Sequence, residues 1–183
     1  MNKYLKGCLI VIAIGVLLIA GIVGWYNQRK TTNGQKARTD EVSFSKICDS
    51  SKLVTEMPSV MLVGFDTIEI RKVRFYLIRQ GRSIRDTILN PKLELPHQFI
   101  STQIPFDTFF KTDTIEVETG AKMERYYQLS EFNHYAYLHY GMMGYLGSYD
   151  CRLDEQGFLV NGKRSEGQLF KKLGSSRLMI KNK

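Results

Sequence analysis

An uninterrupted apolar run near the N-terminus, Gly7 to Tyr26, constrains this chain more than any other stretch. The run contains no charged residue, no amide side chain and no proline. A helix of roughly 20 residues rises about 30 Å, which is the thickness of the hydrocarbon core of a bilayer. Backbone amides find no water to bond in lipid, so a single pass must be helical. The run therefore predicts a transmembrane helix over residues 7–26, preceded by a short head over residues 1–6.

The main alternative for this segment is a cleaved signal peptide whose basic start is Lys3 and Lys6. The apolar part of a signal peptide is usually about 7–15 residues long and ends at a small-x-small cleavage site. This run is longer, and its best small-residue end, Ile22-Val23-Gly24, has a branched side chain where a small one is needed. We therefore expect an uncleaved signal anchor. Two such helices could form a homodimer through the small pair Ala20 and Gly24.

The orientation of this anchor depends on two opposing arguments. Basic residues lie on both sides of the run, and more of them lie after it, as Arg29 and Lys30 illustrate. The positive-inside rule, applied literally, keeps the C-terminal part in the cytoplasm. The order of the segments favours the opposite orientation. Anchors that export their C-terminal domain usually begin with a short head and a first apolar segment, followed by a linker and the domain. We expect the domain on the extracytoplasmic side of the cell membrane, and the cytoplasmic side is the alternative.

The rest of the 183-residue chain divides by composition into a linker and one domain. Residues 27–43 have almost no apolar content, which predicts a flexible polar linker. Residues 44–183 are enough for one ordinary domain and hardly for two. A hydrophobic content of 43%, with ten phenylalanines and ten tyrosines, is sufficient to build its core.

Short segments of strand-like alternation, separated by turn signals, dominate the domain. Arg82–Leu89 is predicted to pair with the strand that ends before Gln80-Gly81, and Asn161-Gly162 is a strong tight-turn dipeptide. A phase shift at Arg71-Lys72 predicts a β-bulge, and Arg177–Ile180 is expected to be the last strand. Turn signals every 8–12 residues indicate a mainly antiparallel all-β domain. We expect a β-sandwich of immunoglobulin-like or transthyretin-like architecture, with a small β-barrel as the alternative.

Two of the three cysteines lie in the domain, Cys48 near its start and Cys151 among its late strands. Outside the cytoplasm they could form a disulfide that closes a loop of about 100 residues. The alternative is a pair of buried free thiols, which behave as small hydrophobes. A disulfide would settle the orientation of the anchor.

A group of basic residues crowds the first predicted hairpin and is a candidate anion-binding patch. Its members are Arg71, Lys72, Arg74, Arg79, Arg82 and Arg85. Arginine forks bind phosphate and carboxylate well. The chain carries a formal charge of +8, and for a chain tied to a membrane we expect anionic lipid or an acidic polymer before nucleic acid. The alternative is a solvated face that pairs with neighbouring acidic side chains.

The stretch from Asn133 to Tyr149 is unusually aromatic and is a candidate binding surface. Its candidate contact residues are Tyr135, Tyr137, His139, Tyr140 and Tyr145. Tyrosine and methionine are favoured at contact sites. The alternative is a strand pair buried on both sides, with tyrosine hydroxyls at its rim. A metal site from His134 and His139 is not expected, because an odd spacing places them on opposite faces of a strand.

The chain contains none of the familiar catalytic or cofactor-binding motifs, so we expect no enzyme activity, no cofactor and no metal. The expected function is that of a non-catalytic binding, assembly or accessory subunit module in the cell envelope, with a protein partner in a membrane complex. One alternative is an anchored hydrolase built from Glu116, Glu118 and His139. The other is a cytoplasmic domain that binds anionic lipid or polymer through the basic hairpin.

Overall fold

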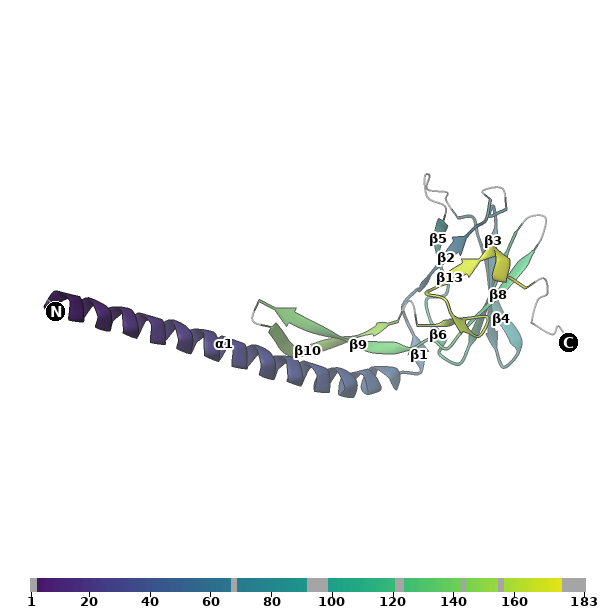
Figure 1. Ribbon diagram of the computed structural model, residues 1–183. Helices are drawn as coiled ribbons and strands as arrows, with labels where there is room; N and C mark the ends of the chain where they lie inside the picture. The colour runs from purple at the N-terminus through teal and green to yellow at the C-terminus, as the bar shows by residue number, and fades with distance from the viewer. Residues whose placement is uncertain are drawn as a thin grey trace. The chain divides into compact units, whose positions relative to one another are not determined.

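The computed structural model describes residues 3–66, 69–91, 99–120, 124–142, 144–154 and 157–175. The chain divides into two compact units: a helix–hairpin unit (residues 1–45 and 136–150) and a β domain (residues 46–135 and 151–183). One long helix, α1 (Lys3–Asp49), precedes the strands (Figure 1). The strands are β1 (Leu53–Val54), β2 (Ser59–Val63), β3 (Val73–Arg79), β4 (Arg82–Leu89), β5 (Phe99–Gln103), β6 (Phe109–Phe110), β7 (Thr114–Thr119), β8 (Arg125–Ser130), β9 (His134–Gly141), β10 (Gly144–Leu153), β11 (Leu159–Val160), β12 (Lys163–Arg164) and β13 (Gln168–Phe170), and a 3₁₀ turn, η1 (Lys171–Leu173), follows them.

Helix α1 contains 47 residues, which gives it a length of about 70 Å. Within the described residues it is the one helix long and apolar enough to cross a membrane. Its large apolar side chains from Ile12 to Tyr26 are exposed, the pattern expected of a helix that crosses a membrane. Ala20 and Gly24 lie one turn apart on this exposed surface, and the homodimer through them stays a prediction.

The structure differs from the prediction of a flexible linker over residues 27–43, because α1 continues unbroken through this segment. The segment contains no proline, and a helix propagates at little cost once the preceding run has nucleated it. The hydroxyls of Thr31, Thr32 and Thr39 donate to carbonyl oxygens four residues earlier, at 3.0–3.2 Å. Local composition alone therefore misled the prediction.

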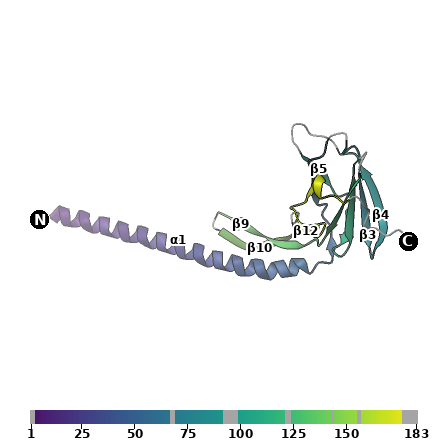
Figure 2. The same ribbon diagram turned by 45° about the vertical axis from the view of Figure 1, so that its right-hand side comes forward.

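Strands β9 and β10 form a two-stranded hairpin. In Figure 1 and Figure 2 this hairpin runs alongside the second half of α1. Residues 136–150 belong with the helix in one unit, whereas the sequence placed all of residues 44–183 in a single domain. Buried and exposed residues alternate along β9, so the hairpin has two faces: an inner face that includes Ala136 and Leu138, and an outer face that includes Tyr137 and His139.

The β domain is mostly antiparallel and contains several sheets. Six strands follow the order β12-β11-β8-β7-β3-β4, three follow the order β13-β2-β5, and β1 pairs with β6. The one parallel pairing among the described strands joins β13 to β2. The described strands do not close into a barrel, so the barrel alternative is wrong. Strand β4 lies at the edge of the six-stranded sheet and is exposed along most of its length, and its charged side chains protect that edge from pairing with another chain.

A single apolar core draws side chains from both larger sheets and from the loops between them. Its centre is a row of aromatic rings, in which Phe132 lies 4.9 Å from Phe109 and 5.4 Å from Phe158 between ring centroids. All three rings are at most 1% exposed. Each such side chain contributes roughly 1.5–3 kcal/mol through burial, which explains why the phenylalanine-rich composition folds as expected.

One local prediction is corrected by the β domain, and another falls outside the described residues. The phase shift at Arg71-Lys72 is not a bulge, because residues 69–72 form a turn and β3 begins at Val73. The register shift in this sheet lies instead between Leu77 and Ile78, where β3 pairs with β4. The predicted last strand, Arg177–Ile180, lies outside the described residues.

The two-residue turn between β3 and β4 offers a small stabilising change. Gln80 and Gly81 both have positive φ, 51° and 75°, as a type I′ turn requires. Asparagine tolerates the left-handed conformation better than glutamine does. We expect Gln80→Asn to raise the free energy of unfolding by about 0.5 kcal/mol, measured by denaturant unfolding. Gly81→Ala, which strains the same turn, is the matched control and should lower it.

Candidate functional site

The inner face of the hairpin packs on a stripe of α1 that is made of small, polar and aromatic residues. The ring of Phe44 stacks on Tyr149 with a centroid distance of 3.9 Å. The backbone amide of Ala136 donates to Ser45 Oγ at 3.2 Å. Ala37, one heptad before Phe44, is 4% exposed. Ala37 and Phe44 are spaced as residues on one face of a helix are. The packed face of α1 can therefore be found from this spacing, but not from a search for apolar residues.

A cavity of about 350 Å³ lies near the hairpin tip, and we call it the tip cavity. Its lining comes from one face of α1 and from the end of the hairpin: Tyr26, Arg29, Lys30, Asn33, Gly34, Tyr140, Gly141, Met142, Gly144 and Tyr145. Burial, and then the neighbouring Asp40 carboxylate, raise the pKa of the Tyr145 hydroxyl. The proton of this hydroxyl is therefore held toward the Asp40 carboxylate. The sequence did not bring Arg29 and Lys30 together with the hairpin residues that complete this cavity.

The five aromatic and histidine residues predicted as one binding surface divide between the two faces of the hairpin. Tyr135 and Tyr137 are 41% and 42% exposed on the outer face. Tyr140 and Tyr145 lie on the inner face, where their ring centroids are 5.8 Å apart, and Tyr145 is 9% exposed. The five therefore do not form one surface. The prediction of a strand pair buried on both sides is also corrected, because the outer face is open.

His139 is held in place on the outer face by side chains of β10. Its Nε2 lies 2.8 Å from a carboxylate oxygen of Asp150, and its Nδ1 lies 3.2 Å from Ser148 Oγ. The ring of Tyr137 lies edge-on to the imidazole at 6.1 Å between centroids. These contacts fix the imidazole and present it beside Tyr137 as part of an open aromatic surface.

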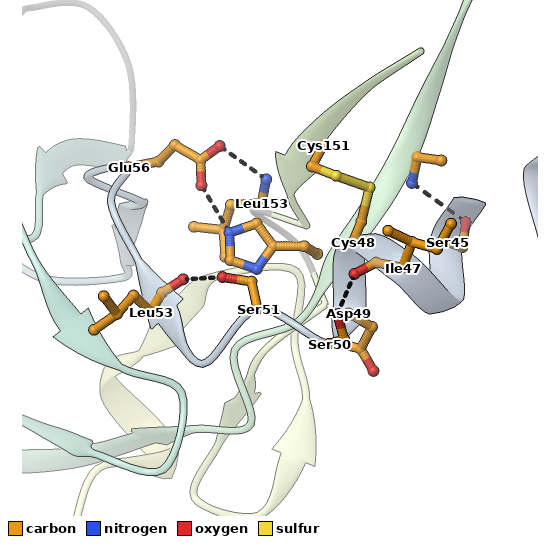
Figure 3. Close-up of a disulfide and its surroundings, with 12 residues drawn as sticks. Ser45, Ile47, Cys48, Asp49, Ser50, Ser51, Leu53, Glu56, Cys151 and Leu153 are labelled. Carbon is orange, nitrogen blue, oxygen red and sulfur yellow. Dashed lines mark hydrogen bonds and ion pairs between the residues drawn. A yellow bond between two sulfur atoms is a disulfide. The ribbon is translucent and has the colours of Figure 1, made fainter. Parts of the chain in front are cut away.

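Cys48, in the last turn of α1, forms a disulfide with Cys151 on β10 (Figure 3). Their Cα atoms are 5.2 Å apart, and the closed loop spans a sequence separation of 103. Cys48 is 2% exposed. Ser45 lies one turn before Cys48, and Asp150 directly precedes Cys151, so the bond joins the two chain segments at the base of the helix–hairpin unit. The sequence had left this pairing open.

Acidic side chains fix the chain around the disulfide within the β domain. One carboxylate oxygen of Glu56 accepts from the Leu153 amide at 3.3 Å (Figure 3). The other lies 3.1 Å from His134 Nε2. Lys111 donates to the Asp49 carboxylate at 2.7 Å and to its carbonyl oxygen at 2.8 Å. The hydrogen bond from Lys111 is the main cause that lowers the pKa of Asp49. Within the β domain, the last turn of α1 and the first residue of β9 are therefore held by charged contacts.

The predicted anion-binding patch is divided by ion pairs and by distance. Arg74, Arg79 and Arg85 pair with Asp86, Asp113 and Asp107. Within the described residues, no carboxylate lies within salt-bridge distance of the other three members, Arg71, Lys72 and Arg82. Arg71 and Lys72 precede β3 and Arg82 follows it, so they are separated by more than about 20 Å along the strand. The six residues do not converge on one ligand.

The carboxylates considered for hydrolysis are also placed unfavourably for that role. Glu116 is 1% exposed in the six-stranded sheet, and Glu118 accepts a 2.5 Å hydrogen bond from the Tyr76 hydroxyl. Burial, and then this hydrogen bond, raise the pKa of Tyr76 above its ordinary value. His139 belongs to the other unit. Among the residues that the structure describes, no three His, Cys, Asp or Glu side chains come together as a metal site would require.

A second cavity, of about 730 Å³, lies in the β domain and was not anticipated from the sequence. Three cations contribute to its lining, which consists of Val63, Gly64, Arg125, Phe170, Lys171, Lys172 and Leu173. Lys171 pairs with Glu69 at 2.7 Å. The buried Nε of Arg125 has no hydrogen-bond partner among the described residues. Cations from β8 and the C-terminal turn meet here because pairing between distant strands brings them together, which local patterns cannot show.

Comparison with known proteins adds no further assignment to this geometry. No protein-family model, no curated protein and no solved structure matches the chain.

Proposed function

We propose that this chain is a single-pass membrane protein that displays a disulfide-closed β domain outside the cytoplasm and works there as a non-catalytic binding or accessory module. The observation that carries the proposal is the continuity of α1. The same helix provides the apolar membrane segment and, without a break, the cysteine of the disulfide. Anchor and domain are thereby joined by a helical stalk instead of a loose tether.

The disulfide supports the extracytoplasmic side. Such bonds persist in oxidising compartments and are rare in the cytosol, where thiols are kept reduced. The basic residues after the membrane segment favour the opposite orientation. Two of them, Arg29 and Lys30, line the tip cavity of the helix–hairpin unit, which gives another reason for their presence. We give the disulfide more weight, since its formation requires an oxidant.

The exposed surface of the hairpin supports a binding role. Tyr137 on the outer face and Leu146 near the tip are 42% and 62% exposed. Exposed tyrosines that keep one polar end are favoured at protein contacts.

For the β domain we propose a sandwich arrangement, supported by the core that its two larger sheets share. The buried Glu116 argues against the hydrolase alternative.

The orientation is tested by trapping the thiol state of the full-length protein in intact cells. A Cys8→Ser background leaves only Cys48 and Cys151 as targets for a bulky maleimide added after acid quenching. We expect no gel shift before reduction and a shift of two labels after it. A Cys8→Ser, Cys48→Ser, Cys151→Ser variant is the control and should not shift at all. Two labels before reduction would mean free thiols and would contradict the extracytoplasmic placement.

A photo-crosslinking residue tests the binding role. Placed at Tyr137, on the open outer face, it should capture the same protein partner in repeated experiments from intact cells. Placed at Leu138, which lies on the inner face and is 7% exposed, it should capture none. Capture of no partner from Tyr137, or of the same set from both positions, would argue against a partner on this face.

A further inference from the structure

The tip cavity has the composition of an anion-binding site. Arg29 and Lys30 contribute two cations, Asn33 contributes an amide, and Tyr140 and Tyr145 contribute two hydroxyls. No carboxylate belongs to its described lining. Arg29 also lies over the Trp25 ring, with its guanidinium carbon 5.0 Å from the centroid, which holds the side chain close to the helix. A planar guanidinium beside an ammonium suits a phosphate group.

The cavity is placed along α1 at the level where the apolar run ends. Tyr26 is the last residue of that run, and Arg29 and Lys30 are the first charges after it. They follow Tyr26 by about 5–6 Å along the helix axis. If residues 7–26 span the hydrocarbon core, this is the depth of the lipid head groups. Trp25 and Tyr26 are the residue types that favour the same layer.

The hairpin tip adds apolar surface at the same level. Met142 is fully exposed, and Tyr140 and Leu146 are each 62% exposed. Met142 and Tyr140 line the cavity together with Tyr26, so the tip lies beside the end of the apolar run. Exposed methionine, leucine and tyrosine beside basic residues are typical of segments that lie in the membrane interface.

We propose that the tip cavity binds the phosphate head group of an anionic phospholipid while the hairpin tip rests in the membrane interface. The proposal rests on the membrane anchoring proposed above and adds a ligand and a second membrane contact to it. Arg29 and Lys30 hold the phosphate, the Tyr140 hydroxyl donates to its oxygens, and Met142 and Leu146 contact the acyl chains. A bound lipid would thus fix the hairpin against the helix.

Charge-neutral variants of the full-length protein in nanodiscs test the ligand. The discs contain phosphatidylglycerol and phosphatidylcholine in equal amounts, and native mass spectrometry counts the lipids that stay bound. We expect Arg29→Gln with Lys30→Gln to lower retained phosphatidylglycerol about tenfold or more, since both cations act at an anionic surface. Lys36→Gln with Arg38→Gln is the matched control on the same helix. These residues start about 15 Å beyond Tyr26, past the screening length of about 8 Å, and should cause less than a twofold loss.

If the two double variants lost the same amount of retained phosphatidylglycerol, the specific site would be overturned. Lipid binding would then be explained by general attraction between the basic helix and the anionic surface. An excess of inorganic phosphate separates a lipid from a free anion: it should leave retained phosphatidylglycerol unchanged, and displacement by phosphate alone would overturn the lipid assignment. Equal retention of both lipids by the unmodified protein would overturn it as well.

The depth of the tip is measured by fluorescence, because Trp25 is the only tryptophan in the chain. In a Trp25→Phe background, Met142→Trp should be quenched strongly by lipids brominated near the head group. Tyr137→Trp, five residues earlier on β9 and about 16 Å farther from the tip, should be quenched much less. Equal quenching of the two, or none at Met142→Trp, would overturn the interfacial contact. Quenching of Trp25 in the unmodified protein reports anchoring separately, so failure of the tip contact is distinguishable from failure of the anchor.

Discussion

Replacing Cys48 and Cys151 together with serine is expected to lower the free energy of unfolding by about 2–5 kcal/mol. The bond closes a loop with a sequence separation of 103, and in the chain-entropy model a loop of about 100 residues gives a contribution of about 4.7 kcal/mol. It also joins the last turn of α1 to β10. Denaturant unfolding of the full-length protein in detergent micelles, followed by near-ultraviolet circular dichroism, measures the change.

Cys8→Ser is the control for this variant, since it removes a cysteine without breaking the disulfide. It should leave the unfolding midpoint within experimental error. If the double variant fails to fold, reduction of the unmodified protein with a phosphine gives the same comparison. An unchanged midpoint in the reduced protein would show that the disulfide does not stabilise the fold.

The bond should also affect hydrogen exchange in the helix–hairpin unit. It joins Cys48, one turn after Ser45, to Cys151 of β10, which pairs with β9. The hydrogen bond between the Ala136 amide of β9 and Ser45 closes the base of this unit. Once the disulfide is removed, we expect faster amide exchange at Ala136 and along the hairpin than in the six-stranded sheet. A uniform change across both units would instead indicate global destabilisation.

Much of the β domain could be predicted from the sequence because its signals are local. Alternation of apolar and polar residues, together with the Gln80-Gly81 turn, gave the strand Arg82–Leu89 with the bounds that the structure has. Asn161-Gly162 forms the tight turn between β11 and β12, and both residues have positive φ. These features depend on neighbours within a few residues, and such neighbours are visible in a pattern.

The predictions failed for segments whose conformation or contacts depend on residues far away in the sequence. Residues 27–43 are polar, yet they are helical and carry the stripe that the hairpin covers, and that hairpin follows about 100 residues later in the chain. Small and polar residues such as Asn33, Ala37 and Asp40 form this stripe, so no apolar periodicity marked it. The tip cavity was missed for the same reason, because its two halves are remote in sequence. The two faces of β9, in contrast, followed directly from strand alternation.

The basic residues of the β3–β4 hairpin suggested a ligand-binding site, but in the structure Arg79 stabilises the fold. Arg79 donates two hydrogen bonds to the Asp113 carboxylate, at 2.9 Å and 2.8 Å, and Asp113 also accepts from the Phe110 amide at 2.9 Å. The hydrogen bond to Asp113 raises the pKa of Arg79. The guanidinium carbon lies 4.3 Å from the centroid of the Phe110 ring. An arginine with this many contacts organises the turn before β7 and is not free to bind a ligand.

Asp113→Ala is therefore expected to destabilise the β domain by about 1–3 kcal/mol, the cost of removing a buried hydrogen-bond acceptor; the Arg79 side chain is 39% exposed, so water can solvate it in the variant. The Asp113 side chain is 0% exposed, and its loss leaves the Phe110 amide and the Arg79 guanidinium without their acceptor. Asp86→Ala removes the partner of Arg74 from the same hairpin, but that carboxylate is 48% exposed, so the loss should be about 1 kcal/mol or less. Denaturant unfolding of both variants gives the comparison. If the two losses were equal and small, Asp113 would not be the organising group that its contacts indicate, and Arg79 would again be a candidate for ligand binding. A large loss at Asp113 alone would mean that the pairing of Arg79 with Asp113 serves the fold, so that Arg79 is not available to bind a ligand.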